Sequence, residues 1–180
     1  MVLKLVKPDK KYLPSVIDAV TEYRSAPAIF TIHAVDKMIA AADNNFAEYF
    51  IDTEKDSLGI DLKPNYVAHT VFWLIDNDKY IGTFDLRHKL TPDLEKIGGH
   101  IAYQIRPAEQ RKGYAYEGLK LCMKKAQFLG LNEVLLTCKA DNIASYGVMH
   151  KAIQQTGGKE IEPFIKDNVI NRRVWLYCKN

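Results

Sequence analysis

The stretch of the chain that decides its fold is IRPAEQRKGYA, residues Ile105–Ala115. The apolar segment before it, Gly98–Arg106, predicts a strand, and Pro107 ends that strand because proline cannot donate the next ladder hydrogen bond. Apolar residues at helical spacing after it predict a helix over Gly113–Leu129. The stretch is therefore a strand–turn–helix junction with a glycine where the helix begins.

This junction is a candidate binding site for a phosphate or pyrophosphate. The first N–H groups of a helix have no partner within the helix, and the helix dipole adds partial positive charge there. Gly113 lets a ligand approach the backbone closely, and Arg111 and Lys112 add charge. Spacing alone favours an ordinary junction, since the sequence matches neither the Walker A loop nor the dinucleotide glycine motif.

The rest of the chain predicts a mixture of helices and strands. Before the junction we expect a strand over Val2–Val6, a helix over Tyr12–Tyr23, a helical region over Val35–Phe50 that breaks near Asp43–Asn45, a surface loop over Asp52–Pro64, a hairpin of strands Tyr66–Ile75 and Tyr80–His88, and a connection over Leu90–Lys96. After it we expect a strand over Glu133–Lys139, a helix from Asp141 or Asn142 to Gln155, and strands over Ile161–Ile165 and Arg173–Cys178. This order predicts an α+β fold of mixed α/β layers, in a single domain over residues 1–180.

Composition limits the class of protein. The net charge is only +3 over 180 residues and the basic residues are spread along the chain, which argues against a nucleic-acid partner. No apolar run approaches the roughly 18 residues that a membrane span needs, and the charged N-terminal segment does not resemble a signal peptide. The three cysteines lack zinc or disulfide spacing. We expect a soluble, cytoplasmic protein without a metal, nucleic-acid or membrane partner.

The junction carries a family resemblance. Residues Gln110–Ala115 match the Q/R-x-x-G-x-G/A loop of the GNAT superfamily of N-acetyltransferases, and Asn142–Ser145 matches the N-x-x-S that follows it in that family. The segments that look like a bacterial subgroup of predicted acetyltransferases are Trp73–Asp76, Tyr80–Gly82, Arg87–His88 and Gly98–Tyr103. The resemblance covers most of residues 66–158. It implies a GNAT-like fold: a central, mostly antiparallel twisted sheet, flanked by helices, whose fourth and fifth strands splay apart.

The resemblance implies that acetyl-CoA is the co-substrate. Main-chain groups near Tyr103 and Ile105 would bind the pantetheine arm as an added strand does. The pyrophosphate would lie on the loop, whose residues are Gln110, Arg111, Lys112, Gly113, Tyr114 and Ala115. Asn142 and Ser145 would flank the arm, although capping of the helix explains Asn142 equally well.

The activity implied is direct transfer of an acetyl group to an amine of a small molecule or peptide. The amine must lose a proton before it attacks, and histidine has a pKa suited to a base. His100, five residues before Ile105, lies where many relatives carry a glutamate base; His88 is a second candidate. We expect neighbouring strands to bring both histidines near one cleft, while a structural role is the common alternative for either.

The acid and the acceptor site are less defined. Many relatives place a tyrosine seven residues after the asparagine, where this chain has Met149; Tyr146, one helical turn earlier, is the candidate acid. Arg87 is a candidate for binding an anionic part of the acceptor, or it pairs with a carboxylate. The missing tyrosine leaves an alternative function open, an acyl-CoA-binding sensor or interaction module without catalysis. Pairing of the apolar C-terminal strands would give a homodimer.

Overall fold

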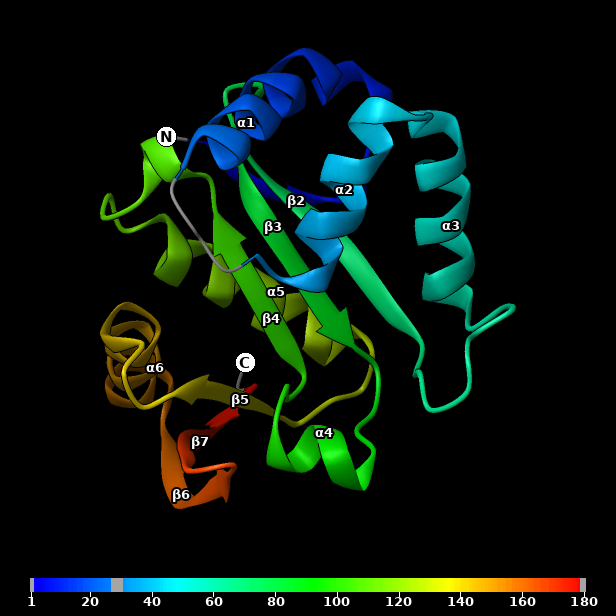
Figure 1. The fold of residues 1–180 in the computed structure, drawn as a ribbon. Helices are drawn as coiled ribbons and strands as arrows, with labels where there is room; N and C mark the ends of the chain where they lie inside the picture. The colour runs from blue at the N-terminus through cyan, green and yellow to red at the C-terminus, as the bar shows by residue number, and fades with distance from the viewer. Residues whose placement is uncertain (1, 27–30, 179–180) are drawn as a thin grey trace.

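Two antiparallel sheets meet in the structure, a computed structural model that describes residues 2–26 and 31–178 (Figure 1). The first has the order β1-β2-β3-β4, formed by Leu3–Val6, His69–Asp76, Lys79–Arg87 and Ile101–Ile105. The second has the order β5-β7-β6, formed by Glu133–Lys139, Val169–Tyr177 and Gly158–Lys166. The division falls between β4 and β5, so the predicted mixed fold with splayed fourth and fifth strands is confirmed.

Helices cover both faces of the first sheet. One face carries α1 (Leu13–Ser25), α2 (His33–Asp43) and α3 (Phe46–Leu58), and the other carries α5 (Tyr114–Phe128) (Figure 1). On the second sheet lies α6 (Ile143–Thr156). The connections contain the short elements η1 (Lys10–Tyr12), α4 (Pro92–Lys96) and η2 (Pro107–Glu109).

Two apolar cores follow from the alternation of side chains along β2 and β3. Trp73 on β2 packs toward Val16 of α1 and Met38 of α2, in the core beneath the N-terminal helices. Leu74 and Phe84 face the opposite way and share the second core with α5, β5 and α6. Each fully buried large apolar side chain of this kind contributes about 1.5–3 kcal/mol to folding. These cores fix the sheet between its two helical layers.

The hairpin predicted from the sequence is confirmed. Residues Asn77 and Asp78 connect β2 to β3 with φ values of 46° and 65°. Two consecutive left-handed residues are the conformation of a type I′ turn, whose twist matches that of the two strands. Asp167 and Asn168, with φ of 48° and 61°, connect β6 to β7 in the same way, so the C-terminal strands extend further than the predicted segments.

The surface loop predicted over Asp52–Pro64 is wrong in its first half, because α3 continues to Leu58. The helix begins where the Asn45 side chain accepts a hydrogen bond from Ala47 N, and it ends at Gly59, whose φ is 72°. The polar residues Asp52, Glu54 and Lys55 are on the solvent face of this amphipathic helix, whereas Thr53 is buried. The predicted break near Asp43–Asn45 is confirmed.

The connection predicted over Leu90–Lys96 contains α4. The Thr91 side chain accepts a hydrogen bond from Leu94 N, and Pro92 stands in the first turn, where its missing N–H costs nothing. This short helix leads the chain from the end of β3 to Gly98, where the two sheets approach each other.

Candidate functional site

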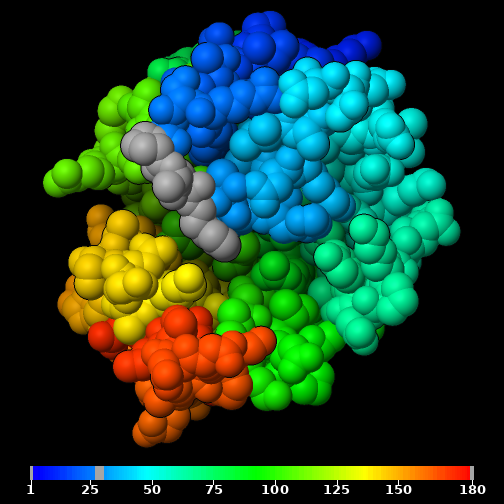
Figure 2. Space-filling model, viewed as in Figure 1, coloured from blue at the N-terminus to red at the C-terminus, as the bar shows by residue number. Residues whose placement is uncertain are grey.

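A gap between the two sheets separates β4 from β5. No ladder joins these strands among the described residues, since β4 ends the order of one sheet and β5 begins that of the other. Figure 2 shows a recess between the N-terminal helices, in blue and cyan, and the C-terminal part, in yellow to red. Just before β4, Gly98 N donates to Thr137 Oγ1 and His100 N donates to Leu135 O, and both acceptors lie on β5. We call this contact the β4–β5 junction.

The predicted phosphate loop lies after β4 and leads into α5. Gly113 is the N-cap residue, with φ of 87°, and no side chain caps the helix there. A Cβ built on Gly113 would have no neighbour within 4 Å, so the space in front of the helix start is open. Arg111 also has positive φ, 62°, and Gln110 Nε2 donates to Ile105 O at 3.2 Å. The loop is thus tied to the end of β4 and leaves the first N–H groups of α5 accessible.

Ion pairs lie next to this loop. The buried Glu109 carboxylate binds the ammonium groups of Lys79 and Lys112. Burial raises the pKa of Glu109, but the hydrogen bonds and charges of the two lysines outweigh it and hold that pKa below its usual range. Tyr114 Oη donates to Asp76 Oδ2 at 3.0 Å, which ties the first turn of α5 to β2. Lys112, one of the residues expected to add positive charge for a phosphate, is thus paired with a carboxylate of its own chain, and binding of an anion by this loop stays a prediction.

Three of the predicted cofactor-binding residues lie together between β4 and α6. Tyr103 Oη lies 3.2 Å from Ser145 Oγ, and burial raises the pKa of Tyr103 to about 12. Asn142 Oδ1 accepts a hydrogen bond from Ser145 N at 3.0 Å, so Asn142 caps α6. A contact of these residues with acetyl-CoA stays a prediction.

His100 is buried at the β4–β5 junction. Its Nδ1 accepts a hydrogen bond from Leu135 N at 2.9 Å, and Trp175 packs edge-on against the ring. Burial and, to a lesser extent, the charge of the nearby Arg87 together lower the pKa of His100 to about 4. The lone pair of the neutral ring is thus used by Leu135, which favours the structural alternative for His100.

His88 and His100 have different hydrogen-bond partners, and a cleft shared by the two rings stays a prediction. His88 Nε2 lies 2.8 Å from Thr70 Oγ1. Phe72 of β2 and Phe128 of α5 line the same hollow as these two residues. Burial lowers the pKa of His88. His88 directly follows β3 and His100 directly precedes β4, and sequence spacing does not reveal the partners of either ring.

The candidate acid lies at the edge of the C-terminal sheet. Tyr146 Oη donates to Glu160 Oε2 at 3.1 Å, and the Arg172 guanidinium lies 4.2 Å from the centre of the tyrosine ring. Met149, at the position of the family tyrosine, is fully buried in the core. Catalysis by Tyr146 stays a prediction.

Arg87 binds the backbone of its own chain. Its Nη1 donates to Gly98 O at 3.1 Å and to Gly99 O at 3.0 Å, while Nη2 lies 3.9 Å from Asp85 Oδ2. These contacts support the expectation of internal pairing, and a contact with an acceptor stays a prediction.

A row of ionisable side chains, buried at His69 and Asp85 and partly exposed at Asp56 and Lys37, was missed from the sequence. His69 Nδ1 lies 2.7 Å from Asp85 Oδ1, His69 Nε2 lies 3.6 Å from Asp56 Oδ2, and Lys37 Nζ binds Asp56 at 2.9 Å. The sequence contained a signal for the pair, since His69 and Asp85 are polar residues in otherwise apolar strands. In the hairpin they lie diagonally across β2 and β3, close enough to interact.

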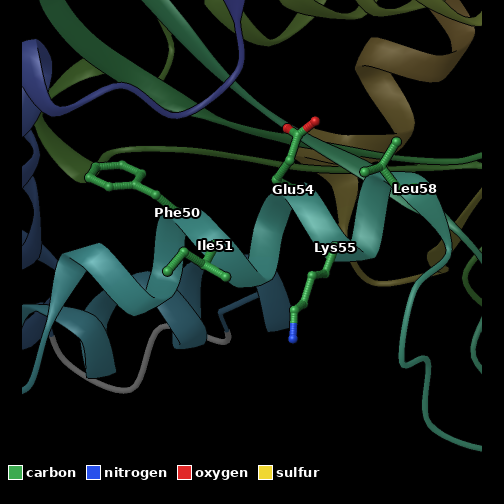
Figure 3. Close-up of a pocket in the computed structure, with 5 residues that line it drawn as sticks. All are labelled: Phe50, Ile51, Glu54, Lys55 and Leu58. Carbon is green, nitrogen blue, oxygen red and sulfur yellow. The ribbon is translucent and has the colours of Figure 1, made fainter.

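A hollow along α3 carries no candidate site residue. It is lined by Phe50, Ile51, Glu54, Lys55 and Leu58, all from one helix (Figure 3). Its charged residues pair with neighbours, since Lys7 lies 2.8 Å from Glu54 and Asp61 lies 3.2 Å from Lys55. We therefore assign no function to this hollow.

Within 2–26 and 31–178, no group of three or more histidine, cysteine or acidic residues could hold a metal ion. No helix in this part of the chain is long and apolar enough to cross a membrane.

Comparison with known proteins agrees with the geometry of the loop and the gap. Residues 13–152 match the family model described as an acetyltransferase (GNAT) domain. Because this match covers well over half of the chain, the protein belongs to the GNAT acetyltransferase family. A comparison with curated proteins found no match.

Solved structures of similar fold include several acetyltransferases. A chimera of spermidine N-acetyltransferase SpeG from Vibrio cholerae and hSSAT has a TM-score of 0.61 at 15% identity, over 98% of this chain and 95% of that one. An acetyltransferase from Salmonella typhimurium that modifies the N-terminal serine of a 50S ribosomal protein has a TM-score of 0.61 at 12% identity, over 98% and 95%. The ribosomal acetyltransferase RimL bound to coenzyme A has a TM-score of 0.56 at 13% identity, over 98% and 93%. At these identities the likeness shows the fold.

Proposed function

We propose that this protein is an N-acetyltransferase that moves an acetyl group from acetyl-CoA directly to an amine. The observation that carries the proposal is the open start of α5 at Gly113, which follows the last strand of a divided sheet. A helix start of this kind binds phosphate through its N–H groups and its dipole. Membership of the GNAT family supports acetyl-CoA as the ligand.

In the proposed complex, the CoA pyrophosphate lies on the N–H groups of the loop Arg111–Ala115. The pantetheine arm lies along β4, near Tyr103 and Ile105, and α6 flanks it with Asn142 and Ser145. The uncharged amine attacks the thioester carbonyl, whose oxygen needs an N–H donor as it gains charge. The carbon–sulfur bond then breaks, the CoA thiolate takes a proton, and the amide product leaves.

The acceptor follows from related proteins only as a class. Solved structures with this fold include enzymes named for spermidine and for the N-terminal serine of a ribosomal protein, so polyamines and peptide α-amines are the first acceptors to test. His88 and Tyr146 remain candidates for proton transfer. The hydrogen bonds that His100 and Arg87 make within the chain favour a structural role for these two residues, which were the other candidates for base and acceptor binding. We propose a cytoplasmic location, which suits the free thiols of this chain, and a homodimer formed through β6, the last strand of its sheet.

One measurement separates transfer from binding. Titration calorimetry should show that acetyl-CoA binds, and thiol release should follow when spermidine or a peptide with a free N-terminus is added. Absence of acetyl-CoA binding would contradict the proposal. Because Met149 replaces the family tyrosine and is buried, the alternative is an acyl-CoA-binding module; binding without thiol release on any amine of a broad panel would favour it.

A further inference from the structure

The His100 side chain takes the place of a backbone carbonyl at the β4–β5 junction. The backbone N–H of His100 donates to Leu135 O at 2.7 Å, and the ring Nδ1 of His100 accepts from Leu135 N at 2.9 Å. A pair of antiparallel residues exchanges the same two bonds through backbone groups alone. One histidine therefore joins two sheets by a pair of hydrogen bonds, in a position where the backbone ladder is absent among the described residues.

Arg87 holds the other side of the same segment. Its Nη1 binds the carbonyls of Gly98 and Gly99, and its backbone N donates to His100 O at 2.8 Å. Gly99 lies so close to β5 that a Cβ on it would stand 2.4 Å from Leu135 O. The segment is thus fixed between β3 and β5 without room for adjustment.

Beyond this junction, β4 and β5 diverge into separate sheets. Strand edges that face each other across a gap can bind an extended ligand through backbone groups, as an added strand does. The width of such a gap depends on how the two strands are held where they meet.

We propose that Arg87 and His100 are positioning residues, a clasp that sets the gap between β4 and β5 for the pantetheine arm, with His100 acting as a hydrogen-bond acceptor rather than as the base. The inference rests on the proposed function, since the arm is the ligand of the gap. The clasp needs a neutral imidazole, because a protonated Nδ1 cannot accept from Leu135 N. The adjacent Arg87 guanidinium and the burial of the ring both favour the neutral form.

Three substitutions of His100 distinguish its role as a hydrogen-bond acceptor at the β4–β5 junction from a role as the general base. The Asn side-chain oxygen occupies the position of Nδ1 and takes no proton near neutral pH, so His100→Asn keeps the acceptor and removes the base. Gln carries its amide one carbon further out, and Ala has no acceptor, so His100→Gln and His100→Ala remove both. We expect His100→Asn to retain kcat and the acetyl-CoA Kd within about threefold, while His100→Ala and His100→Gln raise Kd by about tenfold or more.

The opposite pattern would overturn the clasp. If His100 is the base, kcat falls at least about tenfold in all three variants, Asn included, while Kd stays unchanged. A His100→Ala variant that binds acetyl-CoA as tightly as the wild type would also overturn it.

A second measurement is independent of ligand binding. Hydrogen exchange of the Leu135 amide should be faster in His100→Ala and Arg87→Gln than in the wild type, and close to the wild-type rate in His100→Asn. Equal exchange in all four proteins would show that no clasp exists. A wild type that binds no acetyl-CoA but shows this order of exchange rates would contradict the proposed function. The β4–β5 junction would then be a purely structural contact, and the proposal that Arg87 and His100 position a ligand would be overturned.

Discussion

At the scale of the residue, the hydrogen bonds of a side chain decide which of its chemical roles is available. Sequence spacing places His100 where relatives carry a glutamate base, and the spacing is equally compatible with a base and with a structural group. The bond from Leu135 N to Nδ1 occupies the lone pair that a base requires. No sequence pattern predicts this bond, because Leu135 is 35 residues away on a strand of the other sheet.

Gly113 offers a matched test of the phosphate loop. Gly113→Ala places a methyl group in the open space before α5, so it should weaken acetyl-CoA binding about tenfold. Gly130→Ala is its control, because Gly130 has a φ of 83°, follows the same helix and also has open space around its Cβ position. Both variants should lose about 1 kcal/mol of stability from left-handed strain. Equal Kd values by calorimetry would place the pyrophosphate elsewhere.

His100 also predicts a pH dependence of stability. The unfolded chain takes up a proton on His100 near pH 6.5, whereas in the folded chain its pKa is about 4. The unfolded state therefore binds more protons between these values, and the free energy of unfolding should fall by roughly 3 kcal/mol as the pH drops from 6.5 to 4. Arg87 is the charged group that faces the ring, and the facing residues Leu135 and Trp175 do not titrate.

Urea unfolding at pH 7 and pH 4.5 measures this loss. His100→Asn should lose less stability than the wild type over the same interval, because asparagine does not titrate. The same loss in both proteins would show that other groups control the acid response.

At the scale of the element, most of the fold could be predicted, because hydrophobic periodicity and turn residues are local signals. The hairpin of β2 and β3 and the break before α3 are examples. The end of α3 could not be predicted, because polar residues on its exposed side, such as Asp52 and Glu54, are also typical of a surface loop. The strand–turn–helix stretch that ends at Gly113 could be predicted, because the end of the strand, Pro107 and Gly113 lie within one short segment of sequence.

Two helix caps separate stability from ligand binding. Asn45 caps α3 and Asn142 caps α6, each by accepting one backbone hydrogen bond. Asn45→Ala and Asn142→Ala should each cost about 1 kcal/mol in urea unfolding. If Asn142 also flanks the CoA arm as proposed, only Asn142→Ala should raise the acetyl-CoA Kd. Unchanged Kd values in both variants would leave Asn142 as a cap and nothing more.

At the scale of the whole molecule, the divided sheet was expected only from the family resemblance. Periodicity shows that strands exist, but not which strands pair, because pairing depends on contacts between distant segments. The different partners of His88 and His100 could not be predicted for the same reason, because Thr70 and Leu135 are distant from them in the sequence.

Ligand binding should stabilise the whole domain. Acetyl-CoA at about 100 times its Kd should raise the free energy of unfolding by about 2.7 kcal/mol, since only the folded chain forms the site. S-acetylpantetheine at the same concentration should stabilise less, because it lacks the pyrophosphate that the loop is proposed to bind. Thermal unfolding with each compound measures the difference. Equal shifts in Tm would contradict a pyrophosphate site.

The division of the sheet also has a consequence for the growing polypeptide. The first sheet is complete at Ile105, whereas the second needs β7, which ends at Tyr177. During translation the N-terminal layers can therefore assemble on the ribosome while one wall of the gap has not yet been made. The proposed acetyl-CoA site would therefore be complete only after β7 has been synthesised, too late for the ligand to assist the early steps of folding.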